Sequence, residues 1–541
     1  MAQLFVGNAG RIARPYLDVP EQWGDRRCSL AWSSPTSFAA DANRVAALCA
    51  GFVEGAPAEH AAEYILDAYM RGGVPALTAL LGEYAVAVWD ARRERLVVLA
   101  DPSGSWQIYY THLPGNGIAF ALLLRTLLSA HSMQVRISRP GLASLLSQGA
   151  ASAPHTIAAN AYTLAPDAVL TWSGVGVVSV DRFPRARVPT ARTPATFRDA
   201  LARSLAERLR TSPAVLLLSG GIDSAALFAL SNAPVDTVHL ELPGGAAGAK
   251  AAKSIATGRG ATLHCVTRSA SDERAAFKEH YREQDQPALG GIYEHLVVQA
   301  VREVGATAAV IGVGADELFD GRDLVRQCAL LEALRWIPTR SGRFVTRRAW
   351  PELDTRSWLA GGIQRGASYA LLRRVFGPDQ VATLLGGDRT YTQPLLARNR
   401  KLANSVLQAS LDGMRARTLR HVRSAAIKAG IDLRMPYLEP QVVEAALALP
   451  AQLRVGPRKA LLREIAGDVT TGNNGSLSAI YRGPGLSIAR ETLVKPGSWL
   501  RGAGITLSGR DLARLVEDAS VEQIWTLYAI RRWWEEVVGA P

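Results

Sequence analysis

Residues 214–230 have the sequence AVLLLSGGIDSAALFAL, in which an apolar run, a glycine-containing turn and an alanine-rich segment follow one another. Val215–Leu218 is a short continuous apolar run, typical of a strand buried on both faces, and Ala225–Leu230 has helical propensity. The turn between them contains Gly220 and Gly221, two residues without a Cβ atom. Backbone N–H groups at such a turn can approach an anion at a helix N-terminus. The stretch therefore predicts a phosphate-binding loop.

The loop also indicates which phosphate chemistry to expect. It lacks the lysine of G-x-x-x-x-G-K-[ST], so it does not indicate an NTPase that transfers a γ-phosphate. Asp223 places a carboxylate beside the expected phosphates, which suits a Mg²⁺ ion between them. An ordinary βα turn is the alternative. The hexapeptide S-G-G-I-D-S resembles the S-G-G-x-D-S loop of the ATP pyrophosphatases, which cleave ATP to AMP and pyrophosphate. The resemblance implies ATP binding by Leu218, Ser219, Gly220, Gly221, Asp223 and Ser224.

Strands and helices alternate after this loop. The predicted strands are Val235–Leu242, Ala261–Val266 and Thr307–Gly312, and the predicted helices are Gly244–Gly260 and Ile292–Val304. Such alternation is typical of a doubly wound parallel sheet, in which ligands bind at the carboxyl ends of the strands. We therefore expect Leu240 and Glu241 to meet the adenine of ATP through their backbone.

A second motif follows the strand predicted at residues 307–312. The sequence GVGADELFDG at residues 312–321 resembles the asparagine-synthetase motif G-x-G-A-D-E-L-F-x-G. Gly312 and Gly314 would let the backbone close on the AMP moiety. Asp316 offers a second carboxylate for the magnesium held by Asp223. An acidic βα turn is the alternative, but the two motifs in this order predict a metal-assisted ATP site.

The C-terminal part carries a third resemblance to the same family. Residues 423–439, RSAAIKAGIDLRMPYLE, and residues 456–463, GPRKALLR, resemble S-x-x-x-G-x-E-x-R-x-P-[FY]-L-D and K-x-x-L-R. Asp432 and Glu439 stand where the family usually has Glu and Asp. The resemblance implies that Lys459 stabilises charge at the α-phosphate while pyrophosphate leaves. The sequence does not choose among four possible bases for the attacking amine, which are Glu294, Tyr293, Tyr437 and Asp432.

Residues 1–180 predict a β-rich domain with strands at Gly82–Asp90, Arg95–Ala100 and Gln107–Thr111. The sequence from GEYA at residues 82–85 to WD at 89–90 is followed by ADPSG at 100–104 and YY at 109–110. Together these segments resemble the signature of the N-terminal glutaminase domain of asparagine synthetases, an Ntn-type β-sandwich. That glutaminase uses a cysteine at the second position as its nucleophile, whereas this sequence has Ala2. We therefore expect a disarmed domain that lacks the catalytic Cys and gives structural support to the second domain.

The expected organisation has three parts. Residues 1–180 form the inactive glutaminase-like domain, the Pro- and Arg-rich residues 181–194 form a linker, and residues 195–541 form the adenylating and cyclising domain. The fold class is α/β plus α+β, with a β-sandwich followed by a doubly wound parallel sheet with added helices. The sequence lacks a run of eighteen apolar residues and a signal-peptide pattern, which predicts a cytoplasmic protein without a membrane partner. The cysteines are too scattered to predict a zinc site or a disulfide framework; they are Cys28, Cys49, Cys265 and Cys328.

Most of the net charge of +13 lies in residues 321–420, which hold 18 Lys and Arg against 7 Asp and Glu. This basic helical segment also contains Trp336, Trp350 and Trp358. It could bind nucleic acid, form a helical layer with solvated arginines, or cap an extended peptide. A tRNA-modifying ATP pyrophosphatase would explain the charge but not the glutaminase-like domain, so we do not expect a nucleic-acid partner. A catalytically silent scaffold would be expected to lack Asp223 or Asp316.

The resemblance, taken with Ala2, implies an enzyme whose amine comes from its substrate rather than from glutamine. β-Lactam synthetases and lasso peptide cyclases both use such an internal amine. The intact ADELF sequence at residues 315–319 and the basic segment favour a lasso peptide cyclase. Such an enzyme uses ATP and Mg²⁺ to join a peptide's N-terminal amine to an Asp or Glu side chain. The product is a macrolactam with an isopeptide bond, and AMP and pyrophosphate are released.

The expected partners of a cyclase are a ribosomal precursor core peptide, a leader-peptide-binding protein and a leader peptidase. A β-lactam synthetase-like or asparagine synthetase-like enzyme acting on a small substrate is the alternative.

Overall fold

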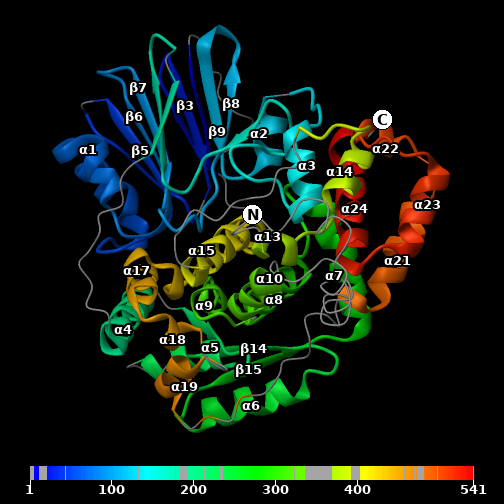
Figure 1. The fold of residues 1–541 in the computed structure, drawn as a ribbon. Coiled ribbons are helices and arrows are strands. Elements are labelled where there is room, and N and C mark those ends of the chain that lie inside the picture. The colour runs from blue at the N-terminus through cyan, green and yellow to red at the C-terminus, as the bar shows by residue number, and fades with distance from the viewer. Residues whose placement is uncertain are drawn as a thin grey trace.

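The computed structural model describes residues 5–10, 21–131 except 34 and 43, 133–182 except 177, 193–210, 214–231, 235–321, 323–334, 368–390, 402–455, 459–467, 469, 471 and 481–539 except 496. An N-terminal β-sandwich lies against a second part built on a parallel sheet (Figure 1). Strand β12 (Val178–Arg182) ends the first part and helix α4 (Pro194–Arg210) begins the second. Most of the predicted linker falls outside the described residues, and so do Trp336, Trp350 and Trp358.

The N-terminal part consists of two six-stranded antiparallel sheets, ordered β10-β8-β9-β1-β3-β2 and β12-β11-β7-β6-β5-β4. Two predicted strands, β6 and β7, have the expected bounds, and the third begins two residues late as β8. The strands are β1 Phe5–Ala9, β2 Gln22–Gly24, β3 Cys28–Trp32, β4 Ser37–Ala40, β5 Val45–Val53, β6 Gly82–Asp90, β7 Arg95–Ala100, β8 Tyr109–Leu113, β9 Gly117–Ala121, β10 Tyr162–Thr163, β11 Ala168–Ser173 and β12.

Apolar side chains from the inner faces of both sheets fill the sandwich, among them Leu48, Trp89 and Phe120. The outer face of the second sheet packs against α1 (Ala61–Thr78), which follows η1 (Ala58–His60). The outer face of the first sheet packs against α2 (Leu124–Ala130) and α3 (Arg139–Gln148). The central strands thus have both faces covered, which explains why β6 is buried along its whole length and β7 along all but its first residue.

The second part is organised by a five-stranded sheet in which every neighbour is parallel, in the order β15-β14-β13-β16-β17. Its strands are β13 Val215–Leu217, β14 Thr237–Glu241, β15 Leu263–Thr267, β16 Ala308–Val310 and β17 Asp432–Arg434. Helices α5 Ile222–Leu230, α6 Ala246–Thr257, α7 Ala270–Glu283 and α8 Ile292–Glu303 connect the first four strands. The predicted doubly wound sheet is therefore present, with bounds shorter than expected.

Helices surround this sheet and extend from it along one side of the molecule (Figure 1). They are α9 Ala315–Leu318, α10 Leu324–Leu334, α13 Ser368–Leu372, α14 Pro378–Leu384, α15 Leu402–Met414, α16 Arg420–Ala429, α17 Pro440–Ala448, α18 Ala451–Arg454, α19 Ala460–Ala466, α21 Pro484–Val494, α22 Trp499–Gly502, α23 Gly509–Asp518 and α24 Val521–Trp533. Short helices of other types are η2 Pro114–Asn116, η3 Arg415–Leu419, η4 Pro436–Leu438 and η5 Trp534–Val538. Within the described residues, no helix combines the length and apolar character that crossing a membrane requires.

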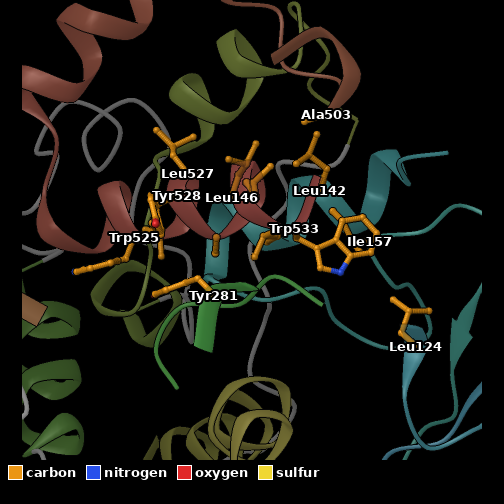
Figure 2. Close-up of a cluster of buried hydrophobic side chains, with 14 of the residues drawn as sticks. Leu124, Leu142, Leu146, Ile157, Tyr281, Ala503, Trp525, Leu527, Tyr528 and Trp533 are labelled. Atoms are coloured by element: carbon orange, nitrogen blue, oxygen red, sulfur yellow. The ribbon is translucent and has the colours of Figure 1, made fainter. Parts of the chain in front are cut away.

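One apolar core joins the two parts. Leu142 and Leu146 of α3 pack in the same cluster as Trp525 and Trp533 of α24, and Tyr281 of α7 belongs to it (Figure 2). The Tyr281 and Trp525 rings stack with centroids 5.6 Å apart. The N-terminal sandwich is therefore built into the rest of the molecule through shared hydrophobic packing.

Candidate functional site

The carboxyl ends of β13 and β16 bring the two sequence motifs together. These strands are parallel neighbours in the middle of the sheet, although they lie far apart in the sequence. From β13 the chain continues to β14 on one side, whereas β16 has β17 on the other side. Ligands of open α/β sheets bind at such a reversal of strand order. The loops that follow β13 and β16 therefore form the candidate site.

The loop after β13 has the shape expected for binding phosphate. Gly220 has φ +79°, and a Cβ atom there would overlap the Gly248 carbonyl at the start of α6. The Ser224 hydroxyl accepts a hydrogen bond from the Ser219 N–H at 3.1 Å, which closes the loop. No side chain caps α5 at Gly221. The first N–H groups of α5 point out of this helix end, the arrangement that binds anions.

The loop after β16 packs beside the first loop. Gly314 has φ +103°, and a Cβ atom there would lie 2.5 Å from Leu438 Cδ2. A Cβ atom on Gly312 would lie 3.5 Å from that of Asp223. Asp316 follows in the first turn of α9. Both aspartates therefore stand at one edge of the sheet, as the two motifs predict.

Lys459 connects these two aspartates. Its Nζ atom lies 2.5 Å and 2.6 Å from the two carboxylate oxygens of Asp223 and 2.5 Å from Oδ1 of Asp316. Lys459 precedes α19 with φ +55° and is only 8% exposed. Gly321 packs against Asp316 and Lys459, because a Cβ atom on Gly321 would overlap the Asp316 carboxylate. Three motifs remote in sequence thus converge on one ammonium group.

The electrostatics of this nucleotide cluster, defined as Asp223, Asp316 and Lys459, favour a charged lysine. Burial lowers the pKa of Lys459, but the attraction of Asp223 and then Asp316 outweighs it, so that the pKa lies above its usual value. Burial raises the pKa of Asp223, the Asp316 charge adds to this effect, and Lys459 opposes it. Two carboxylates and one ammonium leave the ionised cluster with an excess negative charge, which attracts a further cation.

The donor set fits magnesium bound together with a nucleotide. Proteins hold Mg²⁺ through one or two carboxylates that share the ion with substrate phosphates and water. Asp223 and Asp316 supply two such carboxylates, and their oxygens already converge on a cationic group. In the part of the chain that the structure describes, no group of three or more His, Cys, Asp or Glu side chains could hold a metal without further ligands. We therefore expect magnesium to arrive with ATP.

Asp432 lies at the amino end of its strand, opposite to the strand ends from which the two candidate loops leave. It opens β17 and pairs with Ala308 at the amino end of β16, whereas the candidate loops leave from the carboxyl ends. Its carboxylate accepts a hydrogen bond from Arg434 Nε at 2.8 Å. A role as a catalytic base stays a prediction for Asp432. The motif gives the order of residues, but it does not say which end of a short strand faces the cleft.

Tyr437 lies under the phosphate-binding loop. Its side chain is completely buried, and its hydroxyl donates a hydrogen bond to the Asp223 carbonyl at 3.0 Å. Burial raises the pKa of this phenol well above its usual value. Tyr437 supports the loop that carries Asp223, and its role as a base stays a prediction.

The structure places the remaining predicted residues in the first turn of α8 and at the end of β14. Glu294 stands in the first turn of α8, where its charge adds to burial in raising the pKa of Tyr281 and Tyr481. Leu240 and Glu241 end β14, beside β13. The Leu240 side chain belongs to the core, so its backbone is the part available to a ligand. Contact of these residues with ATP stays a prediction.

Sequence reasoning missed a buried histidine beside the phosphate loop. The Nδ1 atom of His239 in β14 lies 2.8 Å from the Leu218 carbonyl oxygen, and the Leu218 N–H donates to the Val238 carbonyl at 2.9 Å. Leu218 is therefore held by its neighbours in the sheet at the point where the loop begins. No sequence motif includes His239, because it lies inside a strand whose other residues give no sign of a functional site.

A cavity of about 130 Å³ lies away from the two loops, between α7, α8 and α16. Two of its histidines hold the segment before α8. The His280 Nε2 atom lies 3.1 Å from the Gly290 carbonyl oxygen, and the His421 Nε2 atom lies 3.3 Å from that of Leu289. Neither of the two motif loops lines this cavity. We therefore assign the candidate site from the convergence of Asp223, Asp316 and Lys459 and not from this cavity.

The N-terminal part offers no replacement for the missing nucleophile among its described cysteines. Ala2 itself lies outside the described residues. Cys28 and Cys49 are completely buried, and burial raises the pKa of both thiols, that of Cys49 to about 12. A nucleophilic cysteine needs an accessible thiolate, so these two residues act as core side chains.

Comparisons with known proteins match the two parts of the chain to different family models. Residues 57–183 match the family model of the glutamine amidotransferase domain. The chain is 27% identical to glutamine-hydrolyzing asparagine synthetase 3 of Bacillus subtilis over 178 residues, which is 31% of this chain and 28% of that protein. It is 24% identical to the amidase chry2 of Gibberella zeae, over 50% of this chain and 44% of that protein. Less than half of either relative's length is thus matched.

A longer match is to glutamine-hydrolyzing asparagine synthetase 1 of Bacillus subtilis, 23% identical over 75% of this chain and 68% of that protein. Among solved structures, an allosteric regulatory enzyme of purine biosynthesis covers 57% of this chain and 74% of its own, with 11% identity and a TM-score of 0.23, from which we conclude nothing. Residues 196–470, just over half of the chain, match the family model of asparagine synthase and contain all three residues of the nucleotide cluster. The chain therefore belongs to the asparagine synthase family.

Proposed function

We propose that this protein is an ATP-dependent, AMP-forming carbon–nitrogen ligase. The observation that carries the proposal is the meeting of Asp223, Asp316 and Lys459 where the strand order reverses. A carboxylate condenses with an amine only after one of its oxygens becomes part of a leaving group. Attack of the carboxylate on the α-phosphorus of ATP creates an acyl-adenylate and releases pyrophosphate. The amine then attacks the acyl carbon, AMP leaves, and the amine proton passes to a base or to water.

Each part of the site has a role in this scheme. The N–H groups at the start of α5 bind the pyrophosphate portion, because a helix N-terminus favours negative charge. Lys459 offsets the negative charge that develops at the α-phosphate, and its raised pKa keeps it protonated at neutral pH. Asp223 and Asp316 would hold Mg²⁺, which neutralises phosphate charge when bound.

We further propose that the substrate is a peptide and that the enzyme is a lasso peptide cyclase. Ala2 removes glutamine as the source of the amine, so the substrate must bring its own. A peptide N-terminal amine has an ordinary pKa of about 7.7 to 8.0, so a fraction is neutral at pH 7 and only a modest base is needed. Glu294 and Tyr293 remain candidates for that base. The acceptor is the side-chain carboxylate of an Asp or Glu in the same peptide.

The proposal extends to the partners. A leader-cleaved ribosomal precursor peptide is the substrate, and a leader-binding protein and a leader peptidase deliver it. The charge of residues 321–420 supports a long contact with a peptide or with these partners. The two asparagine synthetases among the relatives favour the alternative, an enzyme that acts on a small substrate such as free aspartate or a β-amino acid.

The experiment is mass spectrometry of the products formed with ATP, Mg²⁺ and leader-free peptides encoded next to the gene. Loss of one water from a peptide, equimolar AMP, and resistance of the product to carboxypeptidase would support the cyclase. AMP formation with aspartate or a β-amino acid and none with the peptides would replace it by the small-substrate alternative. Lys459→Met is the control for a contaminating ATPase.

A further inference from the structure

We propose that Glu83, a residue of the disarmed N-terminal domain, is a positioning residue for the nucleotide site. The proposal rests on the nucleotide site proposed above and does not depend on the identity of the acyl substrate. It gives the N-terminal domain a role in catalysis without glutamine hydrolysis.

The Glu83 carboxylate makes its contacts across the domain boundary. Glu83 is 1% exposed in β6. Its Oε1 atom accepts hydrogen bonds from Arg208 Nε at 2.8 Å and from the Met435 N–H at 2.7 Å. Its Oε2 atom accepts from Arg423 Nη2 at 3.3 Å. All three donors belong to the second part of the chain, so Glu83 bonds to the domain that binds ATP.

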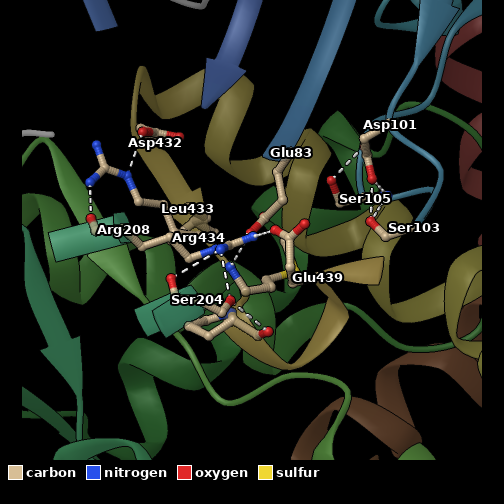
Figure 3. A network of polar contacts seen from close by, with 12 residues as sticks. Glu83, Asp101, Ser103, Ser105, Ser204, Arg208, Asp432, Leu433, Arg434 and Glu439 are labelled. Carbon is tan, nitrogen blue, oxygen red and sulfur yellow. Dashed lines mark hydrogen bonds and ion pairs between the residues drawn. The ribbon is translucent and has the colours of Figure 1, made fainter. Parts of the chain in front are cut away.

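These contacts hold one turn, Met435–Glu439, at both ends. Glu83 binds the N–H of Met435, and Arg208 binds Glu439 through Nη2 at 2.6 Å. In the middle of the turn, the Pro436 carbonyl accepts from the Ser204 hydroxyl at 3.0 Å. Figure 3 shows Glu83 and Glu439 beside the guanidinium groups, with Ser204 close by. The turn is therefore fixed by a buried, charged network with Glu83 as its N-terminal-domain member.

The opposite face of the turn supports both loops of the candidate site. Tyr437 donates to the Asp223 carbonyl at 3.0 Å. Leu438 lies against Gly314 so closely that a Cβ atom on Gly314 would be 2.5 Å from Leu438 Cδ2. A continuous set of contacts thus runs from Glu83 through Met435 and Tyr437 to Asp223, one of the two carboxylates expected to hold magnesium.

The chemistry of Glu83 explains why a neutral residue would not serve. An ionised carboxylate can accept from two arginines and one N–H at once. A glutamine in its place would turn an NH₂ group toward a guanidinium and lose at least one of these bonds. The Met435 N–H or the Arg208 Nε–H would then be left buried without an acceptor, which costs far more than losing an exposed hydrogen bond. The turn would relax, and the loop with Asp223 would lose its support.

The test uses the full chain and four variants. They are Glu83→Gln, Tyr437→Phe, the double variant and Glu94→Gln, the last being a matched control in the same domain. Glu94 forms an exposed ion pair with Arg27 outside the network. The first measurement is amide hydrogen exchange without ATP or Mg²⁺, which follows residues 219–226 directly. The second is the Kd of ATP in the presence of Mg²⁺.

We expect Glu83→Gln to speed exchange in residues 219–226 and to weaken ATP binding, each by about tenfold, as for outer-shell partners of metal ligands. Tyr437→Phe should do the same more weakly. The double variant should match Glu83→Gln alone, because the two residues act in series. Glu94→Gln should behave as wild type. If Glu83→Gln does not fold, Glu83→Asp, which keeps the charge and shortens the reach, takes its place.

The proposal is overturned if the two effects multiply in the double variant. It is also overturned if Glu83→Gln lowers the melting temperature but leaves exchange at residues 219–226 and the ATP Kd unchanged, or if Glu94→Gln has the same effects. A wild-type protein that does not bind ATP with Mg²⁺ would refute the nucleotide site instead, and hydrogen exchange would then decide the role of Glu83 alone.

Discussion

Two groups of oppositely charged side chains in the described part of the chain differ in their access to solvent. In the nucleotide cluster, the Asp223 and Asp316 side chains are 28% and 41% exposed, and one ammonium serves both. In the interdomain cluster, defined as Glu83, Glu439, Arg208 and Arg423, the Glu83 and Glu439 side chains are 1% and 4% exposed, and two guanidiniums serve them. The nucleotide cluster is thus open to solvent and carries an excess of negative charge. The interdomain cluster is closed to solvent, and its positive and negative charges are equal in number.

This difference separates a ligand site from a structural one. A closed cluster gains from its ion pairs only if every charge is matched, because each unmatched charge carries a large desolvation cost. An open cluster with an excess of negative charge is costly in the empty protein and is relieved when a cation enters. Changes to the first cluster should therefore act directly on ATP chemistry, whereas changes to the second should lower folding stability and reach the ATP site only through the Met435–Glu439 turn.

The largest expected effect follows from Asp223→Asn. The variant keeps the size of the side chain and the Lys459–Asp316 pair, but it removes one carboxylate from the expected magnesium site. We expect ATP-dependent AMP formation to fall by about 10³-fold, comparable to losing a main electrostatic contact in a transition state. The melting temperature should stay near that of wild type. Retained activity at saturating Mg²⁺ would contradict the assignment of the open cluster as the ligand site.

Arg208→Met tests the closed cluster. It removes the guanidinium that joins Glu83 to Glu439 and leaves the Glu439 carboxylate buried without its arginine. We expect the free energy of unfolding to fall by about 3 kcal/mol, in the range for breaking a buried pair from one side. Urea unfolding measures it, with Arg27→Met, which breaks the exposed Arg27–Glu94 pair, as the control. A loss as small as in the control would mean that the closed cluster adds little stability.

The smallest expected effect, taken over a single pH unit, concerns the pH dependence of stability. Burial, with Arg420 nearby, lowers the pKa of His421 from 6.5 to about 3. Between pH 3 and 6.5 the unfolded chain therefore binds more protons at this residue, and stability should fall on acidification by up to about 1.4 kcal/mol per pH unit. His280 faces the same ring from α7, and burial lowers its pKa as well.

His421→Gln should flatten this dependence, since glutamine keeps an N–H donor and does not titrate. Urea midpoints at pH 7, 6, 5 and 4 measure the effect. His60→Gln is the control, because the His60 side chain is 56% exposed. An unchanged slope in His421→Gln would show that the acid sensitivity comes from other groups.

Local patterns predicted most of the architecture. The apolar run at residues 215–218 and the Gly220-Gly221 turn depend on neighbours in sequence, and so do the strands at residues 82–90 and 95–100. These features appear where expected, with small shifts of their ends. Asp223 and Asp316 were also predicted to share one magnesium ion, and the family resemblance implied that Lys459 lies near the α-phosphate of the same ATP.

The interdomain cluster could not be predicted in the same way. Glu83 lies in an otherwise apolar strand, and a single glutamate there does not reveal which of many arginines will approach it. Its partners are spread from Arg208 to Met435, and only the folded chain brings them together. The surroundings of Asp432 could not be predicted for a related reason, since a three-residue strand has two ends close in sequence that face different surroundings.

The packing of α24 on α3 has a consequence for synthesis on the ribosome. Leu142 and Leu146 emerge early, whereas Trp525 and Trp533, which share their cluster, are made hundreds of residues later (Figure 2). At about 5 to 20 residues per second, this interval lasts roughly 20 to 80 s. Until α24 has been translated, Leu142 and Leu146 lack the Trp525 and Trp533 side chains with which they share a core in the folded chain.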